Sequence, residues 1–283
     1  MLVTGIEILE RAHKEGYAVG AFNTSNLEIT QAIVEAAEET RSPVIIQVSE
    51  SGLKYAGIET ISAIVRTLAE KASIPIALHL DHGTDFATIM KCLRNGWTSV
   101  MIDASKFPLE ENIKRTKAIV EIAHSMGVSV EAEIGKIGGT EDHITVDEKE
   151  ALMTDPEEAL QFVRETGVDY LAIAIGTAHG PYKGEPKLDF DRLKKIKELL
   201  NIPLVLHGAS GVPEEAIKRA VSLGINKINI DTDIRQAFAG RLRSLLEEDK
   251  EVYDPRKILG PCKDAMKEVI KKKMILFGSS GRA

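Results

Sequence analysis

The sequence predicts an α/β protein, a closed (β/α)8 TIM barrel with an extra N-terminal helix and C-terminal helices. Two observations carry this prediction. Short apolar runs alternate with amphipathic helical patterns eight times along the chain, as expected for a parallel barrel. The length of 283 residues is close to the roughly 250 residues of such barrels, so residues 1–283 are expected to form a single domain. No GxGxxG motif follows the first apolar run, which weighs against an open dinucleotide-binding sheet.

The predicted elements follow one another in chain order. Residues 1–16 predict an amphipathic helix, because apolar and charged residues lie on opposite sides of a helical projection. Apolar runs predict the barrel strands, at residues 18–22, 44–49, 76–83, 99–103, 128–133, 170–175, 203–206 and 225–230. Amphipathic patterns predict the helices between the strands, at about residues 29–38, 58–72, 85–95, 109–126, 156–166, 190–200 and 213–223.

Several stretches lie outside this alternation. Residues 135–153 are poor in apolar residues and predict a long loop, of the kind that usually forms a lid or a binding site. A second loop is expected at 176–187. Residues 233–273 predict two helices separated by Asp254-Pro255, whose apolar faces either close the barrel or form a subunit contact. The last residues, 278–283, predict a flexible tail.

Composition narrows the class of protein. A hydrophobic content of 43% with 28% charged residues indicates a globular protein. The net charge of −7 disfavours binding to nucleic acid or to an anionic membrane surface, and no apolar run approaches the roughly 20 residues of a spanning helix. Cys92 and Cys262 are too few for a disulfide framework, so a cytoplasmic location is expected.

Three histidines occur where the active sites of this fold lie, beyond the carboxyl ends of the strands. His82, His179 and His207 follow the third, sixth and seventh predicted strands. Three imidazoles leave one position open on a tetrahedral metal, which is the arrangement of catalytic zinc. The three residues therefore predict a metal site, and three unrelated histidines are the alternative.

Two further residues of the third strand bear on this site. Asp81 precedes His82, and a carboxylate beside a metal acts either as a proton carrier or as a hydrogen-bond acceptor for a ligand. His79 shares a strand face with Asp81 by the two-residue period, and it either supports a ligand or lies in the core. The sequence leaves both choices open.

Glycine, serine and threonine follow the seventh and eighth strands, the usual place for a phosphate in such barrels. The two segments are Gly208-Ala209-Ser210-Gly211 and Asn229-Ile230-Asp231-Thr232. Glycines let backbone amides approach a phosphate, and the hydroxyls add donors. The segments predict a phosphate site, although ordinary turns have a similar composition.

Four motifs occur in a fixed order: His79-Leu80-Asp81-His82-Gly83, Gly176-Thr177-Ala178-His179-Gly180, Leu206-His207-Gly208-Ala209-Ser210-Gly211 and Asn229-Ile230-Asp231-Thr232-Asp233. The series resembles the class II, zinc-dependent fructose-bisphosphate and tagatose-bisphosphate aldolases. The resemblance runs from about residue 20 to the C-terminal tail. It implies reversible cleavage of fructose 1,6-bisphosphate to dihydroxyacetone phosphate and glyceraldehyde 3-phosphate, in glycolysis and gluconeogenesis, with a tagatose 1,6-bisphosphate or related ketose-phosphate aldolase as the alternative.

The resemblance also implies roles for acidic residues and a cofactor. The triad of histidines would hold Zn²⁺, with a monovalent cation, Na⁺ or K⁺, as an optional addition. Asp81 matches the residue that exchanges a proton with the hydroxyl at the bond to be broken. Asp103 and Glu133 match carboxylates of a second or displaced metal position. Glu141 matches a mobile glutamate that moves the proton of the enediolate, although the neighbouring Asp142 is open as its substitute.

The same resemblance implies a binding site for the sugar phosphates. Arg235 matches an arginine that reaches the distal phosphate in some members. The other substrate-binding positions are Asn23, Ser49, Gly180, Lys183, Gly208, Ala209, Ser210, Asn229, Asp231 and Thr232. The expected partners are a sugar bisphosphate and triose phosphates, and the expected assembly is a homodimer or a homotetramer.

Other classes of function fit the residues less well. A Schiff-base aldolase needs a desolvated lysine, and Lys227 or Lys183 in that role would leave the histidine triad unexplained. A metallohydrolase on this fold would carry a His-x-His pair at the first strand, where the chain has Ala21-Phe22-Asn23. A sugar-phosphate sensor would not need Asp81 together with a mobile carboxylate.

Overall fold

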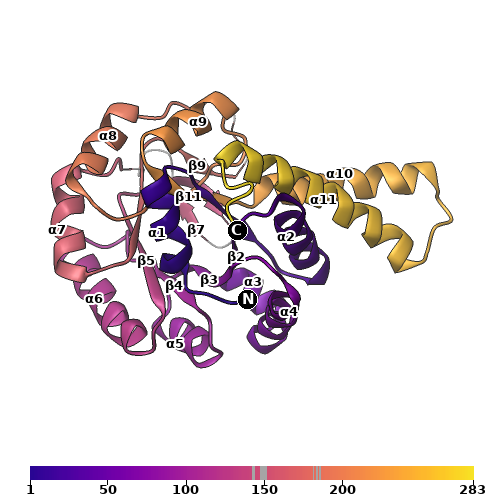
Figure 1. Ribbon diagram of the computed structural model, residues 1–283, viewed down its shortest axis with the longest axis horizontal. Helices are drawn as coiled ribbons and strands as arrows, with labels where there is room; N and C mark the ends of the chain where they lie inside the picture. The colour runs from indigo at the N-terminus through magenta and orange to yellow at the C-terminus, as the bar shows by residue number, and fades with distance from the viewer. Residues whose placement is uncertain (142–143, 147–151, 181, 183, 185) are drawn as a thin grey trace.

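The computed structural model describes residues 1–283 apart from 142–143, 147–151, 181, 183 and 185, and without the side chains of 140, 141 and 144–146. Eight parallel strands close a barrel in which β1 pairs with both β2 and β11 (Figure 1). The predicted (β/α)8 TIM barrel is confirmed. Its strands are β1 (Val19–Asn23), β2 (Val44–Ser49), β3 (Ile76–Gly83), β4 (Ser99–Ile102), β5 (Ser129–Ile134), β8 (Tyr170–Ile173), β10 (Leu204–Leu206) and β11 (Ile225–Ile230).

Helices surround the barrel and cover one of its ends. The predicted N-terminal helix is α1 (Gly5–Glu15), which lies across the strands in Figure 1 and packs Leu9 and Ala12 against their apolar residues. A capping box between Thr4 and Glu7 fixes where α1 begins. The surrounding helices are α2 (Leu27–Thr40), α4 (Ile58–Lys71), α5 (Phe86–Arg94), α6 (Leu109–Ser125), α7 (Pro156–Thr166), α8 (Phe190–Leu199) and α9 (Glu214–Ser222).

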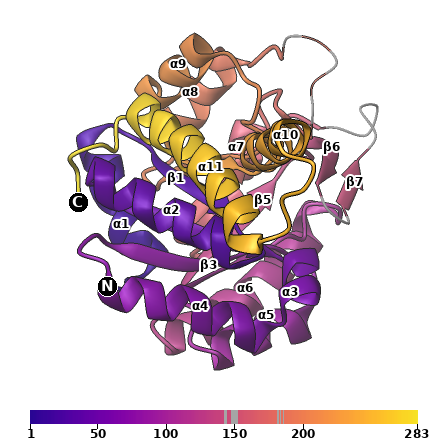
Figure 2. The ribbon, with the colours of Figure 1, turned by 90° about the vertical axis from the view of Figure 1, so that its right-hand side faces the viewer.

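Two long helices complete the chain, α10 (Thr232–Glu248) and α11 (Pro255–Phe277). Their far ends extend beyond the barrel as a hairpin (Figure 1), and α11 lies beside α2 (Figure 2). Met266 and Ile270 are fully buried in the main core, so this face of α11 closes the barrel wall, which is one of the two predicted uses. Within the described part of the chain, no helix is both long and apolar enough to cross a membrane.

Four short elements were missed by hydrophobic periodicity. The predicted long loop contains the hairpin β6 (Gly138–Glu141) and β7 (Ile144–Val146), and β6 also pairs with β9 (Ala178–His179) from the second loop. The seven-residue helix α3 (Glu50–Ala56) follows β2 directly and is capped by Ser49. Strands of two to four residues depend on backbone pairing between distant loops, so they leave no apolar pattern. The side chain of Glu141, and the whole of Asp142 and Lys183, lie outside the described residues.

The prediction of a flexible C-terminal tail was wrong. Backbone N–H groups of Gly281 and Ala283 donate to the carbonyl oxygens of Thr40 and Arg41, each at 2.9 Å. Arg282 forms an ion pair with Glu15 at 2.8 Å. The reason is that the last carbonyl groups of α2 have no partner within the helix, and the tail donates hydrogen bonds to them. The glycine-rich composition of the tail does not indicate this contact.

Deleting residues 279–283 is expected to lower the melting temperature by about 5 °C, because several hydrogen bonds of about 1 kcal/mol each are lost. Thermal unfolding followed by circular dichroism checks this. The matched control is Arg282→Ala, which removes a surface ion pair and the contact of the guanidinium with the ring of Tyr17 and should shift the melting temperature by less than about 2 °C. An unchanged melting temperature in the deletion would mean that the tail contacts contribute nothing to stability.

Candidate active site

The carboxyl end of β3 places two adjacent side chains at the barrel mouth. In a regular strand, neighbouring residues point to opposite faces, yet Asp81 and His82 are both buried, and each contacts a residue in or directly after another barrel strand. The pairing register between β3 and β4 shifts between Leu80 and Gly83, and His82 has a φ of 47°, in the left-handed region that non-glycine residues rarely adopt. This local irregularity brings both functional groups to one site.

The three predicted histidines converge at the mouth. The ring centroids of His82 and His207 lie 4.7 Å apart, and those of His82 and His179 lie 5.1 Å apart. One nitrogen from each ring falls within 4.8 Å of the others. All three side chains are buried, so their nitrogens face one another in an environment with little water.

Two carboxylates fix the orientation of the rings. His82 Nδ1 lies 2.8 Å from Asp103 Oδ2, and His207 Nε2 lies 2.8 Å from Glu131 Oε1. A carboxylate accepts a hydrogen bond from the ring nitrogen that carries the proton. The other nitrogen of each neutral ring therefore keeps its lone pair. Those two nitrogens, His82 Nε2 and His207 Nδ1, lie 2.9 Å apart. Two acceptors cannot bond to each other, so the arrangement fits a cation bound by both.

Electrostatics around the carboxylates supports a cation. Burial raises the pKa of Asp103, but the hydrogen bond and charge of His82 outweigh it and hold that pKa well below its usual value. Burial and the neighbouring Asp103 charge raise the pKa of Glu133 well above its usual value. Glu133 Oε2 lies 3.9 Å from His207 Nδ1 and has no hydrogen-bond partner among the residues described. A buried carboxylate oxygen of this kind suits a divalent ion.

Asp81 is held by three amide side chains. Its Oδ2 accepts from Asn23 Nδ2 at 2.9 Å and from Gln47 Nε2 at 3.1 Å, and its Oδ1 accepts from Asn229 Nδ2 at 3.1 Å. Gln47 also donates to Asn23 Oδ1 at 2.7 Å. Asp81 is fully buried, and its three hydrogen-bond donors are uncharged side chains from β1, β2 and β11.

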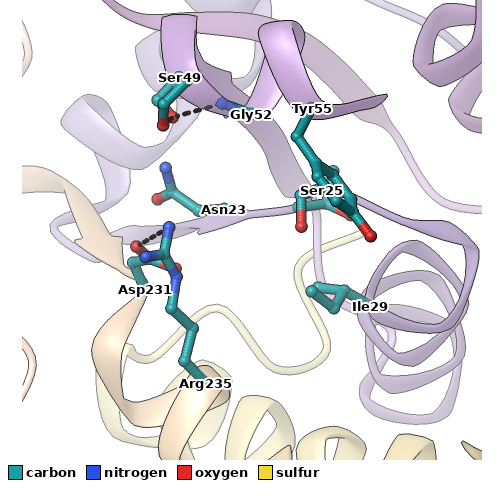
Figure 3. Close-up of a pocket in the computed structure, with 10 residues that line it drawn as sticks. Asn23, Ser25, Ile29, Ser49, Gly52, Tyr55, Asp231 and Arg235 are labelled. Carbon is teal, nitrogen blue, oxygen red and sulfur yellow. Dashed lines mark hydrogen bonds and ion pairs between the residues drawn. The ribbon is translucent and has the colours of Figure 1, made fainter. Parts of the chain in front are cut away.

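Two cavities adjoin this group. One, of about 230 Å³, opens between the ends of β1 and β2 and the start of α10 (Figure 3). Its predicted substrate-binding residues are Asn23, Ser49, Asp231 and Arg235, and Arg235 Nη2 pairs with Asp231 Oδ2 at 2.8 Å. The other, of about 60 Å³, shares Asp231 and Arg235 with the first. Its further lining residues are Ala178, His179, Gly180, Gly208, Ala209, Ser210, Asn229 and Thr232.

Gly208 lines the second cavity at a position where only glycine fits without strain. Its φ is 63°, and a Cβ atom at this position would lie 2.5 Å from the carbonyl oxygen of Ala178. The hydroxyl of Tyr182 accepts from Ala178 N at 2.8 Å and donates to Gly208 O at 2.7 Å. The loops after β8 and β10 are therefore tied together beside the cavity.

A model of the family "Fructose-bisphosphate aldolase class-II" matches residues 3–282. The chain belongs to the class II fructose-bisphosphate aldolase family. It is 52% identical to the fructose-bisphosphate aldolase of Thermus caldophilus, with 100% of both chains covered, and 51% identical to that of Geobacillus stearothermophilus, covering 100% of this chain and 99% of the relative. The predicted family and enzyme class are confirmed.

Solved structures agree with this assignment. The YdjI aldolase of Escherichia coli K12 superposes on this chain with a TM-score of 0.89 at 37% identity, covering 100% of both chains. The fructose-bisphosphate aldolase of Campylobacter jejuni superposes with a TM-score of 0.85 at 26% identity, covering 100% of this chain and 97% of that one. Fold and family are thus supported by sequence and by structure.

His79, whose role the sequence left open, lies inside the barrel. Its side chain is fully buried below the mouth, with Nδ1 2.6 Å from Ser99 Oγ and Nε2 3.3 Å from Glu131 Oε2. His79 therefore contacts a carboxylate that holds His207 and does not join the histidine cluster itself. His79 is thus buried in the core and also contacts a partner of His207, so the choice between the two predicted alternatives stays a prediction.

Sequence reasoning missed two polar residues beside the histidine cluster, Gln47 and Glu131, and considered Lys227 only as a Schiff-base lysine. Each shares an inward strand face with a residue that was singled out, by the two-residue period: Gln47 with Ser49, Glu131 with Glu133, and Lys227 with Asn229. Branched apolar residues usually occupy the inward positions of barrel strands. A polar residue at such a position could therefore have indicated a role at the site.

Proposed function

We propose that the aldolase reversibly cleaves fructose 1,6-bisphosphate to dihydroxyacetone phosphate and glyceraldehyde 3-phosphate, with Zn²⁺ bound by His82, His179 and His207. The observation that carries the metal site is the pair of lone-pair nitrogens 2.9 Å apart on His82 and His207, each ring held by a carboxylate. When bound, zinc supplies a Lewis acid that stabilises the charge developing on the substrate ketone oxygen.

The acidic residues around the metal differ in role. Asp103 orients His82 through Nδ1, and Glu131 orients His207 through Nε2. Glu133 would supply a negative charge next to the histidines once a cation is bound there, and it is close enough to His82 and Asp103 to form a second cluster of cation ligands. We infer that this cluster is the second or displaced metal position. Na⁺ or K⁺ as an additional cation stays a prediction.

Asp81 is the proposed proton carrier. Breaking the carbon-carbon bond requires that the adjacent hydroxyl lose its proton, and the reverse reaction returns it. The three amide side chains all donate hydrogen bonds to Asp81. We propose that one of its carboxylate oxygens takes up the proton of the hydroxyl. Glu141, or Asp142 beside it, is proposed to protonate the enediolate carbon from the segment that includes β6.

The two cavities suit the two ends of a bisphosphate. Backbone amides around Gly208 and Ser210, with Thr232 at the N-terminus of α10, form the kind of donor set that binds a phosphate. Arg235 is proposed to bind the distal phosphate from the larger cavity, and Lys183 stays a predicted phosphate ligand. Such local donors are needed because the whole chain carries a net charge of −7, which repels an anionic substrate.

A Schiff-base mechanism is not favoured. Lys227 is fully buried, but its Nζ lies 2.8 Å from Glu131 Oε2 and donates to Asn229 Oδ1 at 2.7 Å. An amine nucleophile must be neutral and free to attack, whereas the side chain of Lys227 is held in contacts with Glu131 and Asn229. We also infer a cytoplasmic homodimer or homotetramer acting in glycolysis and gluconeogenesis, as the family resemblance implies.

Parallel cleavage assays on fructose 1,6-bisphosphate and tagatose 1,6-bisphosphate test the substrate. We expect kcat/KM to be higher for the fructose epimer by at least about 10-fold, because a site built around one hydroxyl orientation leaves polar groups unpaired with the other. Fructose 6-phosphate, which lacks one phosphate, is the control and should react more slowly than either bisphosphate. A preference for tagatose 1,6-bisphosphate would reverse the assignment.

A further inference from the structure

A charged layer lies inside the barrel beneath the histidines. Lys227, Glu131 and His79 are all fully buried, at inward positions that branched apolar residues usually fill. Replacing a buried ion pair by apolar residues is often neutral or stabilising. Stability of the barrel therefore does not explain why these groups are present, and their contacts with the site have to be considered.

Lys227 contacts two neighbours that lead to different parts of the site. Its Nζ lies 2.8 Å from Glu131 Oε2, and the other oxygen of Glu131 accepts from His207 Nε2 at 2.8 Å. The same Nζ donates to Asn229 Oδ1 at 2.7 Å, and Asn229 Nδ2 donates to Asp81 at 3.1 Å. The lysine on β11 thus reaches across the barrel to β5, past β8 and β10.

The chemistry of an ammonium group makes these contacts directional. Lysine only donates hydrogen bonds, so Asn229 must turn its oxygen toward Lys227 and its NH₂ group toward Asp81. Lys227 likewise holds Glu131 as an acceptor, so the proton of His207 lies on Nε2 and its Nδ1 lone pair faces His82. One buried cation fixes both an amide orientation and a histidine tautomer.

We propose that Lys227 is a positioning residue that aligns the two halves of the active site together, setting His207 through Glu131 and Asp81 through Asn229. The inference rests on the proposed function for the roles of His207 and Asp81. It differs from a purely structural role because it predicts separate losses in metal binding and in turnover.

The main test is the double variant Lys227→Met/Glu131→Gln, which removes both charges while keeping side-chain length. Lys227→Met alone leaves Glu131 buried without its charge partner and can fail to fold, and the double variant avoids this. We expect the double variant to fold, to bind Zn²⁺ about 10- to 100-fold more weakly in chelator competition, and to lose at least about 10-fold in kcat at saturating Zn²⁺, with a smaller change in KM.

Glu131→Gln separates the two arms. Its amide oxygen still offers Lys227 an acceptor, and the bond from Lys227 to Asn229 is kept, so the variant disturbs mainly the His207 arm. Zn²⁺ affinity should fall while kcat at saturating Zn²⁺ stays above that of the double variant. Tyr170→Phe is the matched control. Tyr170 is buried in the same barrel interior and its hydroxyl bonds to Ser99, so Zn²⁺ affinity and kcat should stay within about threefold of the unmodified protein.

A crystal structure of the double variant provides a readout that is independent of activity. We expect the hydrogen bond between Asn229 Nδ2 and Asp81 to be lost. Retention of that bond with unchanged Zn²⁺ affinity would overturn the proposal, as would an equal loss of affinity in Tyr170→Phe. If the unmodified protein binds Zn²⁺ but does not cleave fructose 1,6-bisphosphate, the proposed function fails, whereas the affinities and the structure still decide the role of Lys227.

Discussion

Replacing Asp81 by alanine is expected to lower kcat for fructose 1,6-bisphosphate cleavage by about 10³-fold, the range in which positioned acid-base groups contribute, while Zn²⁺ remains bound. The physical reason is that Asp81 is the proposed proton acceptor. The side chains that surround it, Asn23, Gln47 and Asn229, are amides, which cannot accept the proton in its place. Steady-state kinetics and metal analysis of the purified variant measure the two effects separately.

The matched control for this variant is Asp85→Ala. Asp85 lies four residues further along and caps α5 by accepting from Thr88 N at 2.9 Å, so its loss should cost about 1 kcal/mol of stability and leave kcat unchanged. If Asp81→Ala loses Zn²⁺, the role of Asp81 is to hold the metal site. If Asp81→Ala keeps full turnover, the proton passes through another group.

Removing the metal with a chelator is expected to reduce cleavage to less than about 1% of its initial rate, because no other described group in the site can supply the same stabilisation of the ketone oxygen. Adding Zn²⁺ back should restore the rate. Treatment with borohydride in the presence of substrate should leave the enzyme active, since the buried Lys227 is paired with Glu131. Survival of activity in chelator, or covalent trapping on a lysine, would contradict the metal mechanism.

The barrel could be predicted from the sequence because its strands are buried on both faces. Buried strands leave continuous apolar runs such as Val44–Ser49, and amphipathic helices leave a 3.6-residue pattern between them. The pairing of β6 with β9 could not be predicted in this way, because it joins backbone groups of two loops that lie far apart in the sequence. The contact of the C-terminal tail with α2 is of the same kind.

The active site could be predicted only where one residue type carries the chemistry. His82, His179 and His207 indicate a metal from their positions at strand ends, before any contact is known. Glu131 was missed, and Lys227 was considered only as a Schiff-base lysine, because a pairing between the two leaves no pattern in either strand. They become an ion pair only when barrel closure brings β5 and β11 to face each other across the interior.

The central claim is that three imidazoles and their carboxylate partners hold a catalytic metal. The most direct measurement is anomalous X-ray diffraction at the zinc edge from crystals of the Zn²⁺-loaded protein. The account predicts an anomalous peak about 2.0–2.1 Å from His82 Nε2, His207 Nδ1 and a nitrogen of His179. Fully loaded crystals that show no peak among these atoms, in a preparation that cleaves fructose 1,6-bisphosphate, would contradict it.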